Sequence, residues 1–165
     1  RLPIILYNVP SRTSINMLPK TVARLSKIEN IVGIKEASGN LVQVSEIIQS
    51  CNADFTVISG EDALTWPILA LGGKGVISVT ANLVPEKFSK LCKAALEGDM
   101  AIARSLHYEL LKLNEVMFIE TNPIPVKAAL AIMGRIDNEL RAPLCPPSEE
   151  NLATLKSVLQ EYKLV

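Results

Sequence analysis

Apolar and polar residues alternate along the first hundred positions in a pattern that predicts four β-strands separated by helices. Each short apolar run is followed by an amphipathic segment. The runs read as continuously apolar, which is typical of parallel strands that are covered on both faces. The predicted strands are Ile4–Tyr7, Ile31–Lys35, Phe55–Ser59 and Gly75–Val79, and the predicted helices are Pro19–Lys27, Leu41–Ser50, Ala63–Leu71 and Pro85–Leu96.

Three of these helices carry start signals. Pro19 and Pro85 suit a first helical turn, where the missing N–H group leaves no hydrogen bond unmade. Asn40 suits an N-cap, because its side chain can accept hydrogen bonds from the first backbone amides of the helix.

After Gly98 the pattern predicts helices only. A long helix begins after Asp99 as its cap, carries apolar residues three or four positions apart as far as Met117, and is broken at Pro123. The remaining predictions are a helix over Val126–Met133, a loop over Pro143–Pro147 and a final helix capped by Ser148 that runs to Tyr162.

Four successive β/α units predict an α/β fold with a parallel sheet. Such a sheet has edge amides and apolar faces to cover, so it requires closure or additional strands. Eight units form a TIM barrel of roughly 250 residues. We therefore expect residues 1–98 to form half of a (β/α)8 barrel and residues 99–165 to form a C-terminal helical region.

Composition narrows the class of partner. Seventeen basic residues balance seventeen acidic ones, and no basic run offers a surface for nucleic acid or anionic lipid. The apolar runs are too short to span a membrane. Cys51, Cys92 and Cys145 are scattered and odd in number, which favours a reduced, cytoplasmic setting over a disulfide framework. We expect a small-molecule substrate or another protein chain as partner.

Chemistry is expected at the carboxyl ends of the strands, where parallel barrels place their reacting groups. Lys35 ends a buried strand, where desolvation favours the neutral and therefore nucleophilic amine. Tyr7 ends the neighbouring strand, about 4.8 Å away, so it could pass protons in the same site. Arg12, in the next loop, has the planar fork that suits a carboxylate.

Each of these residues also has a plainer interpretation. Taken alone, Lys35 fits a lysine that extends from a strand end into solvent, Tyr7 a packing residue at the barrel rim, and Arg12 a surface arginine. Gly60 and Gly75 would let backbone approach a ligand, but either could equally serve a turn.

The sequence pattern argues against other candidate catalytic, phosphate-binding and metal-binding residues. His107, the single histidine, falls inside a predicted helix and is expected on a surface or in helix packing. Gly72–Gly75 precedes a strand and lacks the helix start of a phosphate loop, so a glycine turn is preferred. No histidine or carboxylate group has metal-ligand spacing, and neither a metal nor an organic cofactor is expected.

Five separated motifs together resemble the dihydrodipicolinate synthase family, in the order in which that family carries them. They are YNVPSRT from Tyr7, GIKEASG from Gly33, SGED from Ser59, GGKGVISVTAN from Gly72 and NPIPVKAAL from Asn122. The resemblance covers essentially the whole chain. It implies the second half of a TIM barrel with a C-terminal helical extension.

The resemblance also implies a class I aldolase-type synthase that condenses pyruvate with aspartate semialdehyde in lysine and diaminopimelate biosynthesis. By motif match, Lys35 would form the pyruvate imine and Tyr7 would relay protons. Arg12 would hold the aldehyde's carboxylate, Ile77 would contact pyruvate through its backbone, and Gly60 is assigned to the substrate site. The family is usually a homotetramer.

Two departures from the family pattern bear on the transfer of function. Ser14 stands where the family commonly has glycine, which leaves the shape of the Arg12 loop open. The first four β/α units, with the family's carboxylate-binding threonine pair and second relay tyrosine, are absent. We therefore expect a C-terminal fragment, a proteolytic product or one piece of a split enzyme, inactive by itself. Whether lysine inhibits it is left open, because most of that site lies outside the chain.

Two alternatives remain open. A sister lyase acting on N-acetylneuraminate or a keto-deoxy sugar acid would share the lysine and the tyrosine, although Arg12 favours the semialdehyde. In a different class of function, the chain would be a non-catalytic half-barrel assembly module that pairs with itself or with the missing half.

Overall fold

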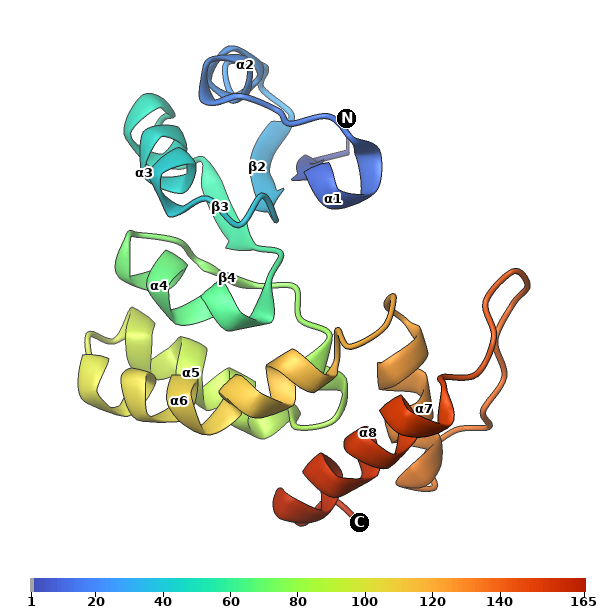
Figure 1. Ribbon diagram of the computed structural model, residues 1–165. Coiled ribbons are helices and arrows are strands. Elements are labelled where there is room, and N and C mark those ends of the chain that lie inside the picture. The colour runs from blue at the N-terminus through green and yellow to red at the C-terminus, as the bar shows by residue number, and fades with distance from the viewer. Residues whose placement is uncertain (1) are drawn as a thin grey trace.

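The computed structural model describes residues 2–165 and contains a four-stranded parallel sheet with the strand order β1-β2-β3-β4 (Figure 1). Each strand therefore lies beside the one that precedes it in the sequence, as β/α repeats require. The strands are β1 (Ile4–Asn8), β2 (Ile31–Glu36), β3 (Thr56–Ser59) and β4 (Gly75–Val76).

Helices connect the strands and extend the chain after the sheet. Between β1 and β4 they are α1 (Pro10–Thr13), α2 (Pro19–Leu25), α3 (Leu41–Ser50), the 3-10 turn η1 (Asp62–Leu64) and α4 (Thr65–Ala70). After β4 they are the 3-10 turn η2 (Thr80–Asn82), α5 (Pro85–Leu96), α6 (Met100–Val116), α7 (Ile124–Ile132) and α8 (Glu149–Glu161).

One face of the sheet packs against helices. Ile34 of β2 and Val57 of β3 point to this face and are almost fully buried. They contact a cluster that contains Val22 of α2, Ile47 of α3 and Ile68 of α4. Burial of these side chains is the main force that holds the helices on the sheet.

The opposite face of the sheet is open in residues 2–165. Ile5 and Tyr7 of β1 are 47% and 50% exposed, and Ile77, just after β4, is 50% exposed. Strands this apolar are typical of sheets with two covered faces, whereas these strands have cover on one. The structure is thus a half-barrel whose concave side is not filled by the described residues.

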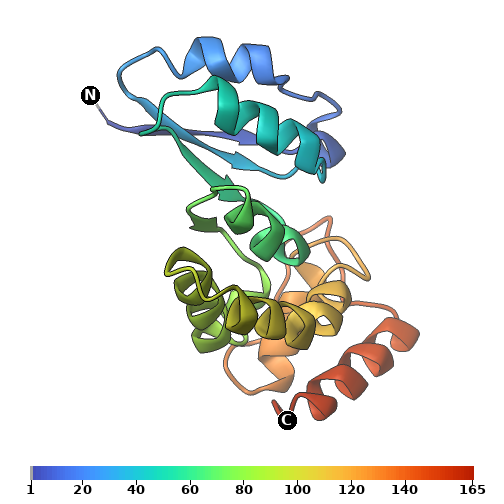
Figure 2. The same cartoon turned by 90° about the vertical axis from the view of Figure 1, so that its left-hand side faces the viewer.

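The C-terminal helices form the larger core (Figure 2). Leu110 and Leu113 of α6 are fully buried, together with Leu91 of α5, Ala129 of α7 and Leu159 of α8. This cluster includes Leu69 of α4, whereas Ile68 of the same helix belongs to the cluster on the sheet, so α4 contributes to both cores. Within residues 2–165 we find no helix with the length and apolar character that a membrane crossing requires.

Most predicted elements are confirmed. Helices α3 and α5 have the predicted bounds, and α2 begins at Pro19. The Asn40 side chain accepts hydrogen bonds from two amides of α3, and Asp99 and Ser148 cap α6 and α8 in the same way. Such capping supplies partners for the amides that a helix start leaves without one.

Other elements differ from the predictions: α2 ends at Leu25, β3 begins at Thr56, and α7 begins two residues before its predicted start. Strand β4 ends at Val76 instead of Val79, because the Val79 amide donates to the Asp62 carboxylate and not to a strand. The helix predicted over Ala63–Leu71 is divided into η1 and α4. The short helix α1 was not predicted, because its four residues, PSRT, carry no apolar periodicity.

Candidate active site

The carboxyl ends of the strands are held in register by backbone hydrogen bonds that continue beyond the strands. Tyr7 pairs with Lys35 in the β1–β2 ladder, so both side chains lie on the open, concave face. The continuing bonds run from the Ala37 amide to the Asn8 carbonyl at 2.9 Å, from Gly60 to Glu36 at 2.8 Å and from Ile77 to Ser59 at 2.9 Å. This ladder aligns the candidate residues of all four strands along one rim.

Lys35 and Tyr7 are in contact. The Lys35 Nζ atom lies 4.1 Å from the centroid of the Tyr7 ring. The Tyr7 ring thus packs against the end of the Lys35 side chain. The structure therefore brings together the two residues that the strand ends predicted to share one site.

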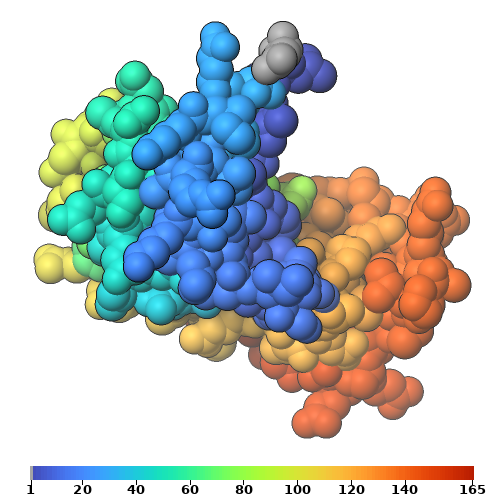
Figure 3. Space-filling view, turned by 90° about the horizontal axis from the view of Figure 1, so that it is seen from above, coloured from blue at the N-terminus to red at the C-terminus, as the bar shows by residue number. Residues whose placement is uncertain are grey.

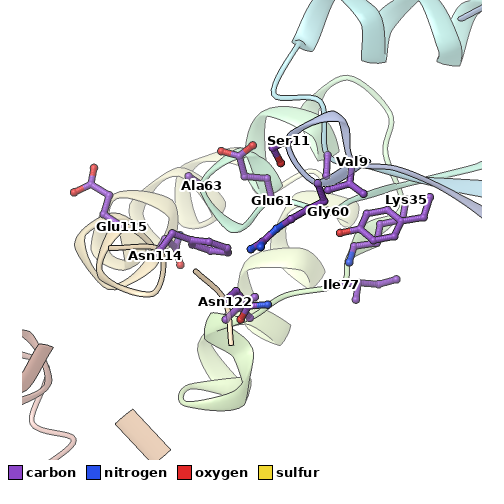
Figure 4. Close-up of a pocket in the computed structure, with 15 residues that line it drawn as sticks. Val9, Ser11, Lys35, Gly60, Glu61, Ala63, Ile77, Asn114, Glu115 and Asn122 are labelled. Atoms are coloured by element: carbon purple, nitrogen blue, oxygen red, sulfur yellow. The ribbon is translucent and has the colours of Figure 1, made fainter. Parts of the chain in front are cut away.

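A cavity of about 410 Å³ opens beside this pair, and the five predicted site residues, Tyr7, Arg12, Lys35, Gly60 and Ile77, all line it. In Figure 4, Lys35 and Ile77 lie on one side of the cavity and Asn114 and Glu115 on the opposite side. The volume lies in the range of pockets that bind small molecules.

Gly60 is needed to make room for the lysine. A Cβ atom at this position would fall 2.7 Å from the Ala37 Cβ and 3.1 Å from the Lys35 Cε. At Gly75 the same atom would meet nothing within 4 Å. The absence of a side chain at Gly60 therefore serves the placement of Lys35, whereas Gly75 has no such constraint.

Arg12 lies on α1, and its loop is closed by Ser14. Ser14 adopts a left-handed conformation with φ 58° and donates its amide to the Pro10 carbonyl at 2.8 Å. This conformation suits glycine best, which explains the residue expected there by resemblance. The loop nevertheless closes with serine.

The Arg12 side chain reaches the connection between α6 and α7. Its Nη1 donates to the Thr121 Oγ1 at 2.8 Å. Figure 3 shows the surface of the N-terminal segment beside that of the C-terminal helices. One N–H of the guanidinium is used in this bond, and others remain for a ligand.

Sequence reasoning missed the part of the cavity wall that α6 supplies. Asn114, Glu115 and Phe118 line the cavity from the C-terminal helices. Asn114 is buried, and its Oδ1 has no hydrogen-bond partner among the described residues. The sequence offered one signal for Asn114: it is a polar residue within the apolar stripe around Leu113. That signal does not indicate which site the side chain faces.

Glu61 also lines the cavity, and the adjacent Asp62 is buried. Burial raises the pKa of Glu61, and the adjacent Asp62 raises it further. The Asp62 Oδ2 accepts from the Val79 amide at 3.0 Å and from the Thr80 amide and hydroxyl at 2.8 and 2.9 Å. Asp62 thus holds the backbone that follows Ile77. Among residues 2–165, no group of three or more histidines, cysteines or carboxylates is placed to hold a metal ion.

The residues that were set aside have the expected packing roles. His107 lies between the rings of Trp66 and Tyr108, with centroids 5.4 and 5.1 Å away, and burial lowers the pKa of its imidazole. Gly72, at φ 110°, begins the turn that follows α4.

The half-barrel carries a lysine and a tyrosine at the ends of neighbouring strands. It therefore falls into the class of barrel proteins that place a lysine amine at the carboxyl ends of their strands. The sequence profile of the Dihydrodipicolinate synthetase family matches residues 1–162. The chain belongs to this family.

Individual synthases are similar to this chain over nearly its whole length. The chain is 57% identical over 159 residues to the 4-hydroxy-tetrahydrodipicolinate synthase of Nitratidesulfovibrio vulgaris strain DP4, matching 96% of this chain and 54% of that enzyme. It is 56% identical over 164 residues to the synthase of Citrifermentans bemidjiense, matching 99% of this chain and 57% of that enzyme. The chain therefore spans little more than half the length of these relatives.

Solved structures show the same fold. The crystal structure of dihydrodipicolinate synthase from Aquifex aeolicus superposes with a TM-score of 0.96 at 48% identity, covering 98% of this chain and 56% of that one. The enzyme from Acinetobacter baumannii, whose structure is a complex with pyruvate, superposes with a TM-score of 0.97 at 41% identity, covering 100% and 57%. The fold is thus that of half of a TIM barrel with C-terminal helices, as predicted.

Proposed function

We propose that this chain carries the lysine half of the active site of a class I aldolase-type synthase that condenses pyruvate with aspartate semialdehyde. The observation that carries the proposal is the contact of the Lys35 amine with the Tyr7 ring at the mouth of the cavity. Family membership and the pyruvate bound to the Acinetobacter baumannii enzyme support this choice of substrate.

In the proposed reaction, the neutral Lys35 amine attacks the carbonyl carbon of pyruvate to form a carbinolamine. Loss of water gives a protonated imine, and loss of a methyl proton gives an enamine. The enamine carbon attacks the aldehyde of the second substrate. The protonated imine accepts the electron pair, so neither a metal nor an organic cofactor takes part. Tyr7 passes protons to and from the carbinolamine oxygen.

The other site residues hold the substrates. Arg12 binds the carboxylate of the semialdehyde through the N–H groups that Thr121 does not use. The backbone of Ile77 contacts pyruvate at the end of β4, and Gly60 keeps the space into which Lys35 extends. Both are assigned to the substrate site because they line the same cavity as the lysine.

The missing part of the enzyme is proposed to cover the concave face of the sheet. In this proposal residues 1–98 are the second half of the barrel, residues 99–165 are its helical extension, and four further β/α units complete the site. The exposed side chains of Ile5, Tyr7 and Ile77 support it. The chain alone is then inactive, and the completed protein is a cytoplasmic homotetramer.

The experiment uses a completed enzyme, in which this chain is joined to the part of the Nitratidesulfovibrio vulgaris synthase that it does not match. Condensation of pyruvate with aspartate semialdehyde is compared with cleavage of N-acetylneuraminate and of a keto-deoxy sugar acid. We expect condensation, and we expect it to be lost in Lys35→Ala but kept in Lys74→Ala, whose side chain is exposed. Cleavage without condensation would favour the sister lyase, and no reaction would favour the assembly module.

A further inference from the structure

A buried cluster of polar side chains lies behind the strand ends, on the opposite face of the sheet from the lysine. It consists of Asn8, Glu36 and Gln43, which are 2%, 1% and 5% exposed, and of Asn16 at its edge. Glu36 follows Lys35 directly, and Asn8 follows Tyr7. The two residues are partners in the β1–β2 register.

The Glu36 carboxylate is the centre of this cluster. It accepts hydrogen bonds from the Asn8 Nδ2 at 3.0 and 3.2 Å, from the Gln43 Nε2 at 3.2 Å and from the Ser38 amide at 2.6 Å. Every donor is neutral, and no ion pair to Glu36 is present among residues 2–165. A buried carboxylate held by neutral donors alone is costly to desolvate, so it needs most of these bonds to persist.

The cluster also reaches the loop that carries Arg12. The Asn8 Oδ1 accepts from the Met17 amide at 2.9 Å, and the Asn8 Nδ2 donates to the Asn16 Oδ1 at 2.9 Å. Asn16 in turn donates to the Gln43 Oε1 at 2.8 Å. One set of hydrogen bonds therefore links the end of β1, the end of β2, the first turn of α3 and the end of the Arg12 loop.

We propose that Glu36 is a positioning residue for the Lys35–Tyr7 pair, acting through Asn8. The inference rests on the function proposed above. Glu36 touches neither substrate, because its side chain faces away from the cavity and does not line it. It fixes the two strand ends relative to each other, and with them the distance between the amine and the phenol ring.

The chemistry of the cluster requires a carboxylate at this position. Three separate donors converge on two acceptor oxygens. Glutamine at position 36 would offer one oxygen and one NH2 group, and the NH2 group would face a donor. Glu36→Gln therefore keeps the size of the side chain but places two donors against each other in a buried site.

The acceptors and donors can also be exchanged between the two strands. In the double variant Asn8→Asp with Glu36→Gln, the new amide on β2 donates to the new carboxylate on β1. The cluster keeps one carboxylate, and the carboxylate on β1 still accepts from the Met17 amide. A half-turn of the Asn16 and Gln43 amide groups then pairs their donors and acceptors with the exchanged groups. Function lost in the single variant should return in the double variant if the hydrogen bond across the strands is what matters.

The test uses the completed enzyme with Glu36→Gln, the double variant and the control Glu46→Gln, which removes an exposed charge from α3. Measured are kcat, both KM values, the rate at which borohydride traps pyruvate on Lys35, and the melting temperature. We expect Glu36→Gln to lower kcat and the trapping rate about 10- to 100-fold, since small misplacements of reacting groups have effects of this size. The double variant should recover most of the loss, and Glu46→Gln should match the unaltered enzyme.

Two outcomes would overturn the inference. One is a Glu36→Gln enzyme with unchanged kcat and trapping rate. The other is equal impairment of the single and double variants in proportion to their loss of melting temperature, which indicates a purely structural role. If Glu36→Gln does not fold, Gln43→Met removes one of the three donors to Glu36, together with the bonds between Gln43 and Asn16, and should give a smaller loss of trapping rate; an unchanged rate would count against the proposal. Failure of the unaltered enzyme to trap pyruvate on Lys35 would instead refute the proposed function itself.

Discussion

At the scale of single residues, the site depends on how little space surrounds the Lys35 stem. The amine lies 4.1 Å from the centroid of the Tyr7 ring, and Gly60, the residue after β3, borders the lysine. The strand register could be foreseen from the apolar pattern, and with it the meeting of Lys35 and Tyr7. The role of Gly60 could not, because it depends on atoms of Ala37 and Lys35 that approach only in the folded chain.

Gly60→Ala should therefore move the amine. The added Cβ would fall 2.7 Å from the Ala37 Cβ and 3.1 Å from the Lys35 Cε, so the lysine stem must shift. We expect trapping of pyruvate by the completed enzyme to slow about 10- to 100-fold. Gly75→Ala is the matched control, because its Cβ enters open space. Equal trapping rates in the two variants would show that the lysine does not depend on this spacing.

Glu61 should make stability depend on pH. Because burial and then Asp62 raise the pKa of Glu61 above its ordinary value of 4.5, the folded chain holds this proton more tightly than the unfolded chain. The stabilisation is complete below pH 4.5 and is lost as pH rises through the raised pKa. Glu61→Gln should thus melt at a higher temperature than the unaltered enzyme at pH 7 and at an equal temperature near pH 4.

The size of this effect is limited by solvent, since the Glu61 side chain is partly exposed. We expect less than about 1 kcal/mol, or about 1–3 °C in melting temperature. The measurement is thermal unfolding of both proteins between pH 4 and pH 8, compared as a difference so that other carboxyls cancel. A difference that grows toward acid pH would contradict the assignment.

At the scale of elements, the site joins parts of the chain that sequence pattern treats separately. The apolar pattern predicted each β/α unit, and helices α3 and α5 were placed correctly because their start signals are local. The connection between α6 and α7 had no such signal. Its residue Thr121 reaches Arg12 across 109 positions, and Asp62 reaches Thr80 across 18. Contacts between residues this far apart in the sequence depend on the tertiary fold, and they produce no periodic pattern in the sequence.

Thr121→Val tests whether the C-terminal helices help to hold the second substrate. The substitution removes the acceptor of the 2.8 Å hydrogen bond from Arg12 and leaves the size of the side chain nearly unchanged. We expect KM for aspartate semialdehyde to rise about 3- to 10-fold, the equivalent of one ordinary hydrogen bond. KM for pyruvate should not change.

Thr121→Ser provides the control, because it keeps the hydroxyl that accepts from Arg12. Steady-state kinetics of the completed enzyme with each substrate varied in turn would give both constants. If the valine and serine variants behave alike, the hydroxyl has no part in holding Arg12.

At the scale of the whole molecule, the open concave face is the main feature. The apolar runs in the sequence indicated strands with both faces covered. In the structure, the described residues cover one face of the sheet. The half-barrel and its helical extension could thus be predicted from the sequence. The division at residue 98 remains a prediction, and so does the tetramer, which concerns contacts beyond this chain.

The chain by itself should associate or bind apolar dyes. Leu2 is 85% exposed, and Ile4 and Ile5 of the edge strand β1 are 45% and 47% exposed. Strand β1 has no partner on its outer side among the described residues. Exposed apolar surface next to a free strand edge favours association. Sedimentation and dye fluorescence of the chain alone should show oligomers and dye binding, and the completed enzyme should bind less dye. A dye-free monomer would show that the concave face needs no cover.

The most direct test of the central claim is the mass of the peptide that contains Lys35 after the completed enzyme has been treated with pyruvate and borohydride. Reduction of the imine fixes pyruvate on the amine, so the peptide should gain the mass of pyruvic acid less one oxygen atom. The same peptide treated with borohydride alone should keep its mass. A gain on a different lysine, or no gain on any peptide, would contradict the assignment of Lys35 as the residue that captures the keto acid.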